Sequence, residues 1–188
     1  MRITGGKLRG RLIEPPSGFK ARPTTDFARE SLMNILTNRY DFSAVSFLDL
    51  FGGTGAISYE LASRGTEDID IIETDRRNCE FIRNTIRQFE MKSARVHRMD
   101  VRDWLNICHK QYDIIFADPP YALKWLPEIP GMVLRSGAVS SSTLFILEHP
   151  RTMDFSVHEA LSEHRNNGNV NFSFFLRQGS EIQPAKGP

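Results

Sequence analysis

The stretch Asp118-Pro-Pro-Tyr121 has the residue types that point most specifically to chemistry. Two consecutive prolines fix φ and lack N–H groups, so they hold the Asp118 carboxylate and the Pro119 carbonyl in a rigid arrangement. These two oxygens can accept both hydrogens of a planar exocyclic amine, which localises the nitrogen lone pair and aims it at an electrophilic methyl group. Tyr121 offers an aromatic face on which a base can stack. The alternative, that the prolines only end a strand, leaves Asp118 unexplained.

A glycine-rich turn lies within residues 45–57, between an apolar run and a helical pattern. Such a turn lets the backbone approach a ligand, and the helix N-terminus offers unpaired N–H groups. Gly53 and Gly55 are present, but Ser58 stands where the dinucleotide fingerprint has its third glycine. Asp49 would repel a diphosphate and attract an amino-acid ammonium group. The turn therefore predicts a nucleotide-like ligand without a required pyrophosphate, although taken alone it could be a plain loop.

Two further carboxylates complete a candidate cofactor site. Glu73 follows the turn by about 20 residues, the separation at which an acid can accept hydrogen bonds from a ribose diol. Asp100 could accept from the exocyclic amine of an adenine. Together with the turn they describe an adenosine site that does not need phosphate, and S-adenosylmethionine fits it better than NAD.

Strand and helix patterns alternate from residue 45 onward, which predicts an α/β fold with a mostly parallel sheet and helices on both faces. The expected strands begin near residue 45 and cover 69–72, 94–97, 112–117 and 143–147. An antiparallel pair, 162–165 and 170–177, makes seven strands in all. The expected helices cover residues 26–38, 56–63, 75–88 and 101–107, with another within 126–135. Ligands collect at the carboxyl ends of such strands, and each of the four acids named above closes one of them.

The first 25 residues differ in charge from the rest of the chain. They carry a net charge of +5, whereas the remainder carries −4. Short strands at 2–4 and 8–13 around Gly5-Gly6 predict a β-hairpin, and a basic arm favours binding to a polyanion. A solvated, partly disordered terminus is the alternative. The candidate phosphate contacts are Arg2, Lys7, Arg9, Arg11, Lys20 and Arg22. We expect an arm over 1–25, one domain over 26–178 and a flexible tail over 179–188.

Taken together, these motifs resemble class I S-adenosylmethionine-dependent methyltransferases that modify amino nitrogens. The N-terminal Arg2-Ile-Thr-Gly-Gly-Lys-Leu-Arg-Gly-Arg11 and Arg22-Pro-Thr-Thr-Asp-Phe-Ala-Arg-Glu-Ser-Leu-Met-Asn-Ile-Leu36 are similar to the RsmD family. That family methylates N2 of a guanine in bacterial 16S ribosomal RNA. The similarity extends from Arg2 to about Arg177, with two small departures: Gly52 stands where many relatives have alanine, and Met33 where phenylalanine is common.

The resemblance implies a Rossmann-like class I methyltransferase fold and a role for each motif. Gly53, Gly55 and Glu73 would bind the cofactor, and Asp100 would contact its adenine. Asp118 and Tyr121 would serve the target guanine, and the basic hairpin would contact RNA. The Asp-Pro-Pro-Tyr motif also occurs in DNA adenine-N6 and protein-glutamine methyltransferases, so these activities remain alternatives. A dehydrogenase or a non-catalytic binding module is a more distant alternative.

The remaining features set expectations for partners and location. The partner would be 16S ribosomal RNA or an assembling small subunit, with an exposed or flipped-out guanine. A basic, polar start and the lack of a long apolar run predict a cytoplasmic protein without a membrane span. We expect a monomer without a metal. Cys79 and Cys108 are expected to be reduced helix residues, and His149 a satisfied surface histidine rather than a catalyst.

Overall fold

A seven-stranded sheet organises the computed structural model, which describes residues 1–16, 26–92, 94–168 and 170–177. The strand order is β3-β2-β1-β4-β5-β7-β6. The first five strands pair in parallel, whereas β7 runs antiparallel to both β5 and β6. The strands are β1 (Ser46–Asp49), β2 (Asp68–Glu73), β3 (Ala94–Arg98), β4 (Tyr112–Ala117), β5 (Val139–Pro150), β6 (Leu161–Asn167) and β7 (Val170–Phe175).

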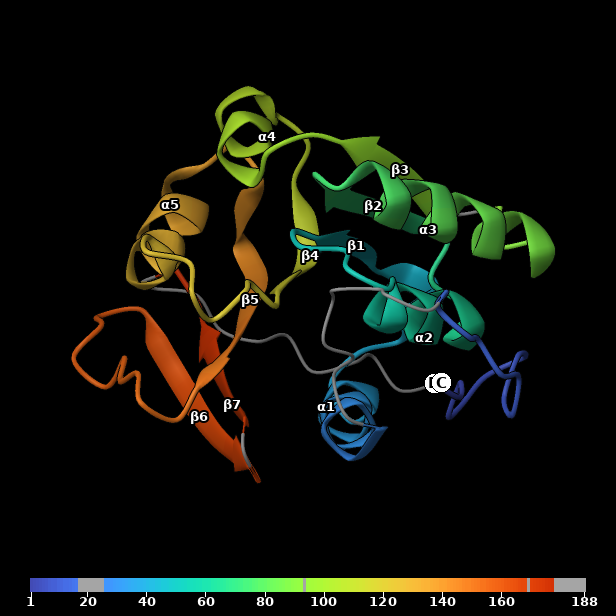
Figure 1. Cartoon of the computed structure of the whole chain (residues 1–188). Helices are drawn as coiled ribbons and strands as arrows, with labels where there is room; N and C mark the ends of the chain where they lie inside the picture. The colour runs from blue at the N-terminus through green and yellow to red at the C-terminus, as the bar shows by residue number, and fades with distance from the viewer. Residues whose placement is uncertain (17–25, 93, 169, 178–188) are drawn as a thin grey trace.

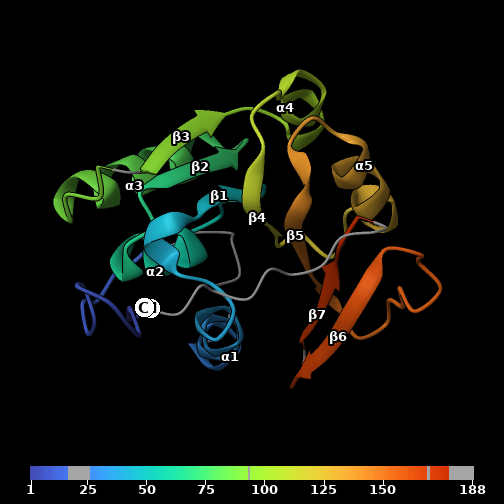
Figure 2. The same ribbon diagram turned by 180° about the vertical axis from the view of Figure 1, so that it is seen from behind.

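Helices cover both faces of this sheet (Figure 1, and from behind in Figure 2). Those packed in one core are α1 (Asp26–Thr37), α2 (Ala56–Arg64) and α3 (Arg76–Gln88), and those in the other are α4 (Val101–Ile107) and α5 (Ile129–Arg135). Short 3₁₀ helices, η1 (Phe42–Ala44) and η2 (Leu126–Glu128), precede β1 and α5. Strands that are covered on both sides must be apolar throughout, which explains why β4 is buried at nearly every position.

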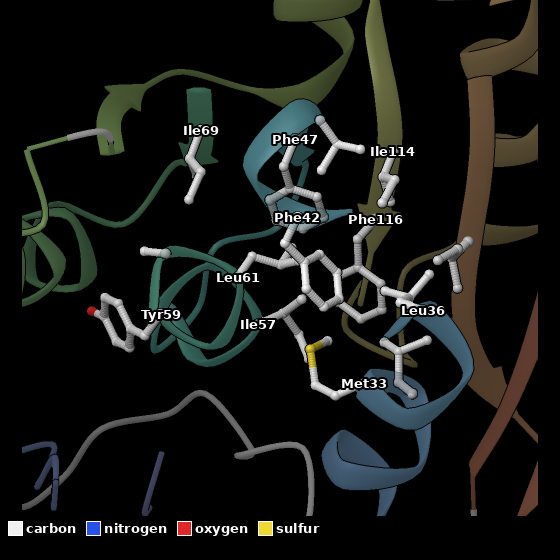
Figure 3. Close-up of a cluster of buried hydrophobic side chains, with 14 of the residues drawn as sticks. Met33, Leu36, Phe42, Phe47, Ile57, Tyr59, Leu61, Ile69, Ile114 and Phe116 are labelled. Carbon is white, nitrogen blue, oxygen red and sulfur yellow. The ribbon is translucent and has the colours of Figure 1, made fainter. Parts of the chain in front are cut away.

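The core on the α1–α3 side is built from side chains that point from β1 and β4 toward α1 and α2 (Figure 3). Phe47 and Phe116 pack there against Ile57 and Leu61 of α2, and Met33 comes from α1. This packing fixes the glycine turn, because the turn joins β1 to α2 and both ends are held in the core.

The expected architecture is confirmed, including the parallel sheet and the C-terminal antiparallel pair. β5 is longer than expected, since it begins at Val139 and reaches Leu144 after a register shift opposite β4. Cys79 lies in α3 and Cys108 directly follows α4, and both are buried and free. The expected tail lies outside the described residues, as do Lys20 and Arg22 of the arm.

His149 differs from expectation in its location. It is fully buried in β5, where its Nε2 lies 2.8 Å from the Ser173 hydroxyl and its Nδ1 lies 3.1 Å from the Pro150 carbonyl oxygen. Burial is the main reason why the pKa of His149 is lowered from 6.5. The expectation of a satisfied histidine is right, but the surface position is wrong, because the imidazole packs against the rings of Phe155 and His164, whose centroids lie 4.9 and 5.8 Å away.

The N-terminal arm is a looser hairpin than expected. The expected structure had two short strands joined by a turn at Gly5-Gly6. Its described residues, 1–16, form a single antiparallel bridge, Arg2 with Leu12, and the chain reverses over residues 5–10. Gly5-Gly6 serves a different purpose from the expected turn. A Cβ on Gly6 would lie 1.9 Å from the Ser63 carbonyl oxygen, so the glycines allow the arm to pack against the end of α2.

A buried carboxylate ties the arm to the domain. Glu60 of α2 accepts hydrogen bonds from the Thr4 N–H (2.7 Å), the Thr4 hydroxyl (3.0 Å) and the Arg29 Nε (3.2 Å). Arg29 also donates to the Arg2 carbonyl and to Asp26. Since the side chains of Glu60 and Arg29 are each only 1% exposed, this ion pair joins the arm, α1 and α2 away from solvent.

We predict that Glu60→Ala lowers the free energy of unfolding by about 3 kcal/mol or more, because it leaves the Arg29 guanidinium buried without that partner. The same variant should expose the arm to limited proteolysis. Urea unfolding and trypsin digestion measure the two effects.

Glu80→Ala is the matched control, since Glu80 pairs with Arg76 on the exposed side of α3. It should change stability far less. Equal losses in the two variants would contradict the anchoring role of Glu60.

Candidate active site

The expected site residues gather at the carboxyl edge of four neighbouring strands. Asp49 ends β1 and is in register with Ile71 of β2 on one side and Phe116 of β4 on the other. Glu73 ends β2, and Asp118 directly follows β4. Asp100 comes two residues after β3, whose last residue is paired with Glu73. Parallel pairing therefore brings the four carboxylates to one edge of the sheet.

The glycine turn is shaped by backbone angles that favour glycine. Gly53 has φ of 52° and Gly55 has φ of 80°, and Gly55 is the N-cap of α2. A Cβ on Gly55 would lie 2.5 Å from the Tyr59 ring, so both conformation and space favour glycine there. The turn thus presents backbone rather than side chains beside the end of β1.

Glu73 is fixed by two backbone amides. Its Oε2 accepts from the Gly53 N–H at 2.8 Å, and its Oε1 accepts from the Asp75 N–H at 2.8 Å. The carboxylate therefore bridges the glycine turn and the start of α3. This explains how a residue 20 positions away in sequence is held against the turn.

Asp49 is a buried acid, and only one of its two carboxylate oxygens accepts a hydrogen bond of good geometry from the described residues. It is 2% exposed, and its Oδ2 accepts from the Ser58 hydroxyl at 2.7 Å. Its Oδ1 is buried without a hydrogen-bond partner of good geometry among the described residues. Burial raises the pKa of Asp49 to about 7, opposed by the Ser58 hydroxyl and the Phe51 amide and assisted by the negative charge of Glu73. A buried acceptor without a partner fits a ligand that brings a positively charged donor.

The Asp-Pro-Pro-Tyr motif leaves the sheet at the end of β4. Asp118 is half-buried, Pro119 is buried and Pro120 is exposed. Tyr121 is 37% exposed. The Pro120 carbonyl accepts from the Leu123 N–H at 2.8 Å, so the chain turns away from the sheet directly after the motif.

Asp100 has a structural task at this edge. It caps α4 by accepting from the Arg102 N–H at 2.9 Å, and the Arg102 guanidinium lies 3.0 Å from the same carboxylate oxygen. The Arg102 side chain is the main reason why the pKa of Asp100 is lowered. The guanidinium also lies over the Trp125 ring, 5.1 Å from its centroid.

Phe51, Arg102 and Trp125 were not singled out from the sequence. The ring centroids of Phe51 and Trp125 are 6.1 Å apart, so these residues link the glycine turn, α4 and the loop after Pro120. An available signal was the presence of an aromatic residue inside the glycine motif and another four positions after Tyr121.

The arm lies along α2 and reaches the glycine turn. Its Lys7 N–H donates to the Ser63 carbonyl at 2.7 Å, and the Thr54 hydroxyl of the turn lies 3.8 Å from the Met1 sulfur. The expected RNA contacts in the described part of the arm are all exposed, and they are Arg2, Lys7, Arg9 and Arg11.

The described residues show neither a membrane-spanning helix nor a cluster of metal ligands. None of their helices has the length and apolar character needed to cross a bilayer. They contain no group of three or more His, Cys, Asp and Glu side chains placed to hold a metal ion. Two surface hollows lie along α1 and beside Asp70, and neither is lined by the strand-end carboxylates described above.

The strand order and the antiparallel β7 define the class I methyltransferase fold. Two solved structures share it closely. The putative methyltransferase yhhF from Escherichia coli has a TM-score of 0.81 at 28% identity, covering 97% of this chain and 99% of that one. A hypothetical protein of Thermus thermophilus has a TM-score of 0.84 at 30% identity, covering 94% and 99%.

The model of the protein family described as "Conserved hypothetical protein 95" matches residues 1–176, and the chain belongs to this family. The resemblance to the RsmD family is thereby confirmed. Among curated relatives, the ribosomal RNA small subunit methyltransferase D of Escherichia coli K12 is 30% identical over 148 residues. That alignment covers 79% of this chain and 74% of the relative.

The raised pKa of Asp49 predicts a specific pH dependence of stability. Between about pH 4 and 7 the folded state retains a proton that the unfolded state has lost, so stability contributed by this group falls as pH rises through that range. Relative to Asp49→Asn, the wild type should lose up to about 1.4 kcal/mol of unfolding free energy per pH unit. Urea unfolding of the ligand-free proteins measures this difference.

Ser58→Ala provides the companion measurement. The Ser58 hydroxyl lowers the pKa of Asp49. Its removal should raise that pKa further, so the free energy of unfolding should continue to fall up to a higher pH. Parallel stability curves for wild type and Asp49→Asn from pH 4 to 8 would show that the carboxylate is not buried as described.

Proposed function

We propose that the protein transfers a methyl group from S-adenosylmethionine to the exocyclic N2 of a guanine in 16S ribosomal RNA. The observation that carries this proposal is the position of Asp118-Pro-Pro-Tyr121, next to the strand that leads into the glycine turn, in a chain of this methyltransferase family. The name of the Escherichia coli relative, a small-subunit ribosomal RNA methyltransferase, supports the substrate class.

The residues at the strand ends fit this cofactor. The spare Oδ1 of Asp49 would accept from the methionyl ammonium, and Glu73, already fixed against the turn, would accept from the ribose hydroxyls. Gly53 and Gly55 would let the cofactor approach the backbone, and Asp100 would contact the adenine amine. When bound, S-adenosylmethionine supplies an electrophilic methyl group on a sulfonium.

The chain itself must activate a weak nucleophile. The lone pair of a guanine amine is delocalised into the ring, so it attacks poorly without help. The Asp118 carboxylate and the Pro119 carbonyl would accept its two hydrogens, localising the lone pair and orienting it. Asp118 would also receive the proton that the amine loses on methylation. Tyr121, which is 37% exposed, would hold the base by stacking.

The arm accounts for RNA as the substrate. Guanine N2 faces the shallow groove of paired RNA, so an unpaired or flipped-out base must be presented to the site. The exposed Arg2, Lys7, Arg9 and Arg11 would bind phosphates, with Lys20 and Arg22 added from the segment outside the described residues. The protein would act as a monomer in the cytoplasm, on the RNA or on an assembling small subunit.

We predict that Asp118→Ala lowers the rate of methyl transfer by about a hundredfold or more while cofactor affinity changes little, because the role of Asp118 begins only when the amine is in place. Glu73→Ala should weaken cofactor binding first. Single-turnover assays and calorimetric titration separate the two effects.

Glu67→Ala is the control, since it removes an exposed carboxylate just before the opposite end of β2. It should leave rate and affinity unchanged. Equal loss of cofactor binding in the Asp118 and Glu73 variants would overturn this division of roles.

The target atom can be tested directly. Ribosomal RNA from cells lacking the protein should accept labelled methyl groups, and digestion should release N2-methylguanosine. The same RNA with inosine at the mapped position should accept none, because inosine lacks the N2 amine. Transfer to DNA adenine or to a protein glutamine instead of RNA would favour the alternative activities.

A further inference from the structure

Positive charge is concentrated in two separate segments of the chain. Residues 1–25 carry a net charge of +5, residues 76–98 also carry +5, and all other residues together carry −9. The second segment consists of α3, β3 and the turn between them. A protein with a total charge of only +1 thus has a second region as basic as the arm.

Four arginines of this segment lie on α3 and form what we call the α3 basic face: Arg76, Arg77, Arg83 and Arg87. Arg76, Arg83 and Arg87 are separated by seven and four residues, so they project from one side of the helix. The opposite side is buried against the sheet through Cys79, Ile82 and Thr85. The row extends for about 16 Å along the helix axis.

Most of this charge is not neutralised within the protein. Arg76 pairs with Glu80, but Arg77, Arg83 and Arg87 have no ion-pair partner among the described residues. Arg83 donates to the Val96 carbonyl at 3.0 Å and Arg87 to the Asn84 side chain, which orient the guanidinium groups without cancelling their charge. All four residues are exposed.

Protection of the sheet edge does not explain these residues. β3 is one of the two edge strands, and charged side chains on such a strand discourage pairing with other chains. Arg95 of β3 fits that purpose, and it is neutralised by Asp68 and Asp70. The α3 basic face lies on a helix that packs against a face of the sheet. Its arginines therefore do not protect the edge strand.

The α3 basic face starts at the candidate active site. Glu73 accepts from the Asp75 N–H, and α3 begins at the next residue, so Arg76 and Arg77 lie near the strand-end carboxylates. The remaining arginines follow α3 away from the site. On the same side of the sheet, the arm follows α2 away from the glycine turn (Figure 1).

We propose that the α3 basic face binds the phosphate backbone of the same structured RNA, outside the segment that carries the target base. This inference rests on the proposed function. Spaced guanidinium groups are suited to phosphate oxygens, and they position an RNA without reading its sequence. The arm and α3 then hold the RNA at two places, with the methylation site at the start of both.

The test compares two double variants that each remove two exposed positive charges. Arg77→Gln/Arg87→Gln changes the α3 basic face, whereas Arg135→Gln/Arg177→Gln changes exposed arginines at the end of α5 and after β7. Binding to 16S ribosomal RNA is measured by filter retention across a range of potassium chloride concentrations. Cofactor affinity and the thermal midpoint are measured on the same samples.

The α3 variant should bind RNA about tenfold more weakly at low salt, and its plot of log affinity against log salt should be shallower by about 1.5. The Arg135/Arg177 variant should match the wild type, and neither variant should change cofactor affinity or the thermal midpoint. If the α3 variant retains wild-type affinity and slope, the inference is overturned.

The experiment also separates this inference from the proposed function. A wild-type protein that binds RNA but transfers no methyl group would refute the proposed activity, while the comparison of slopes would still decide the role of α3. A wild-type protein that binds neither 16S ribosomal RNA nor small ribosomal subunits would refute both.

Discussion

Parallel pairing of β1 between β2 and β4 is the constraint on which the site depends. Because Asp49 is in register with Ile71 and Phe116, the chain segments that leave these three strands must emerge at one edge. Strand pairing thereby brings together carboxylates that are far apart in sequence, and the carboxylates themselves do not need to contact one another. The glycine turn adds a cross-link outside the sheet pairing, the hydrogen bond from the Gly53 N–H to Glu73.

Helix α2 connects this edge to the rest of the molecule. Its first turn grows out of the glycine turn, and its last turn receives the arm through Ser63. Between them, Glu60 holds the arm and α1 through a buried ion pair. A charge of this kind is costly to bury without a partner, so moving any of the three segments away would leave Glu60 or Arg29 with fewer partners in the interior. The arm is therefore packed against the domain along α2.

The sequence was most informative where periodicity and turn chemistry agree. The alternation of apolar strands with amphipathic helices predicted the sheet, and the position of each acid after an apolar run predicted its place at a strand end. The sequence could not reveal that Gly5-Gly6 is needed for close approach to Ser63, because that requirement comes from a helix more than fifty residues away. The burial of His149 was hidden for a similar reason, since it depends on the rings of Phe155 and His164 packing against it.

Roles within the site were harder to predict than positions. Asp100 also caps α4 and pairs with Arg102, and the stacking of Arg102 over Trp125 joins segments that no local pattern relates. The second basic segment is obscured in the sequence because residues 26–188 together carry a net charge of −4. Its positive charge is outweighed by the acids of the other strands and loops, so only the three-dimensional placement of α3 separates it from them.

The state of Asp49 has a consequence for the energetics of ligand capture. With a pKa of about 7, this acid is close to half protonated in neutral buffer. An arriving ammonium group favours the ionised form, so its capture expels a fraction of a proton into the surrounding solution. The heat released on titration would then vary with the ionisation enthalpy of the buffer, and the donor would be held more tightly on the alkaline side of neutrality.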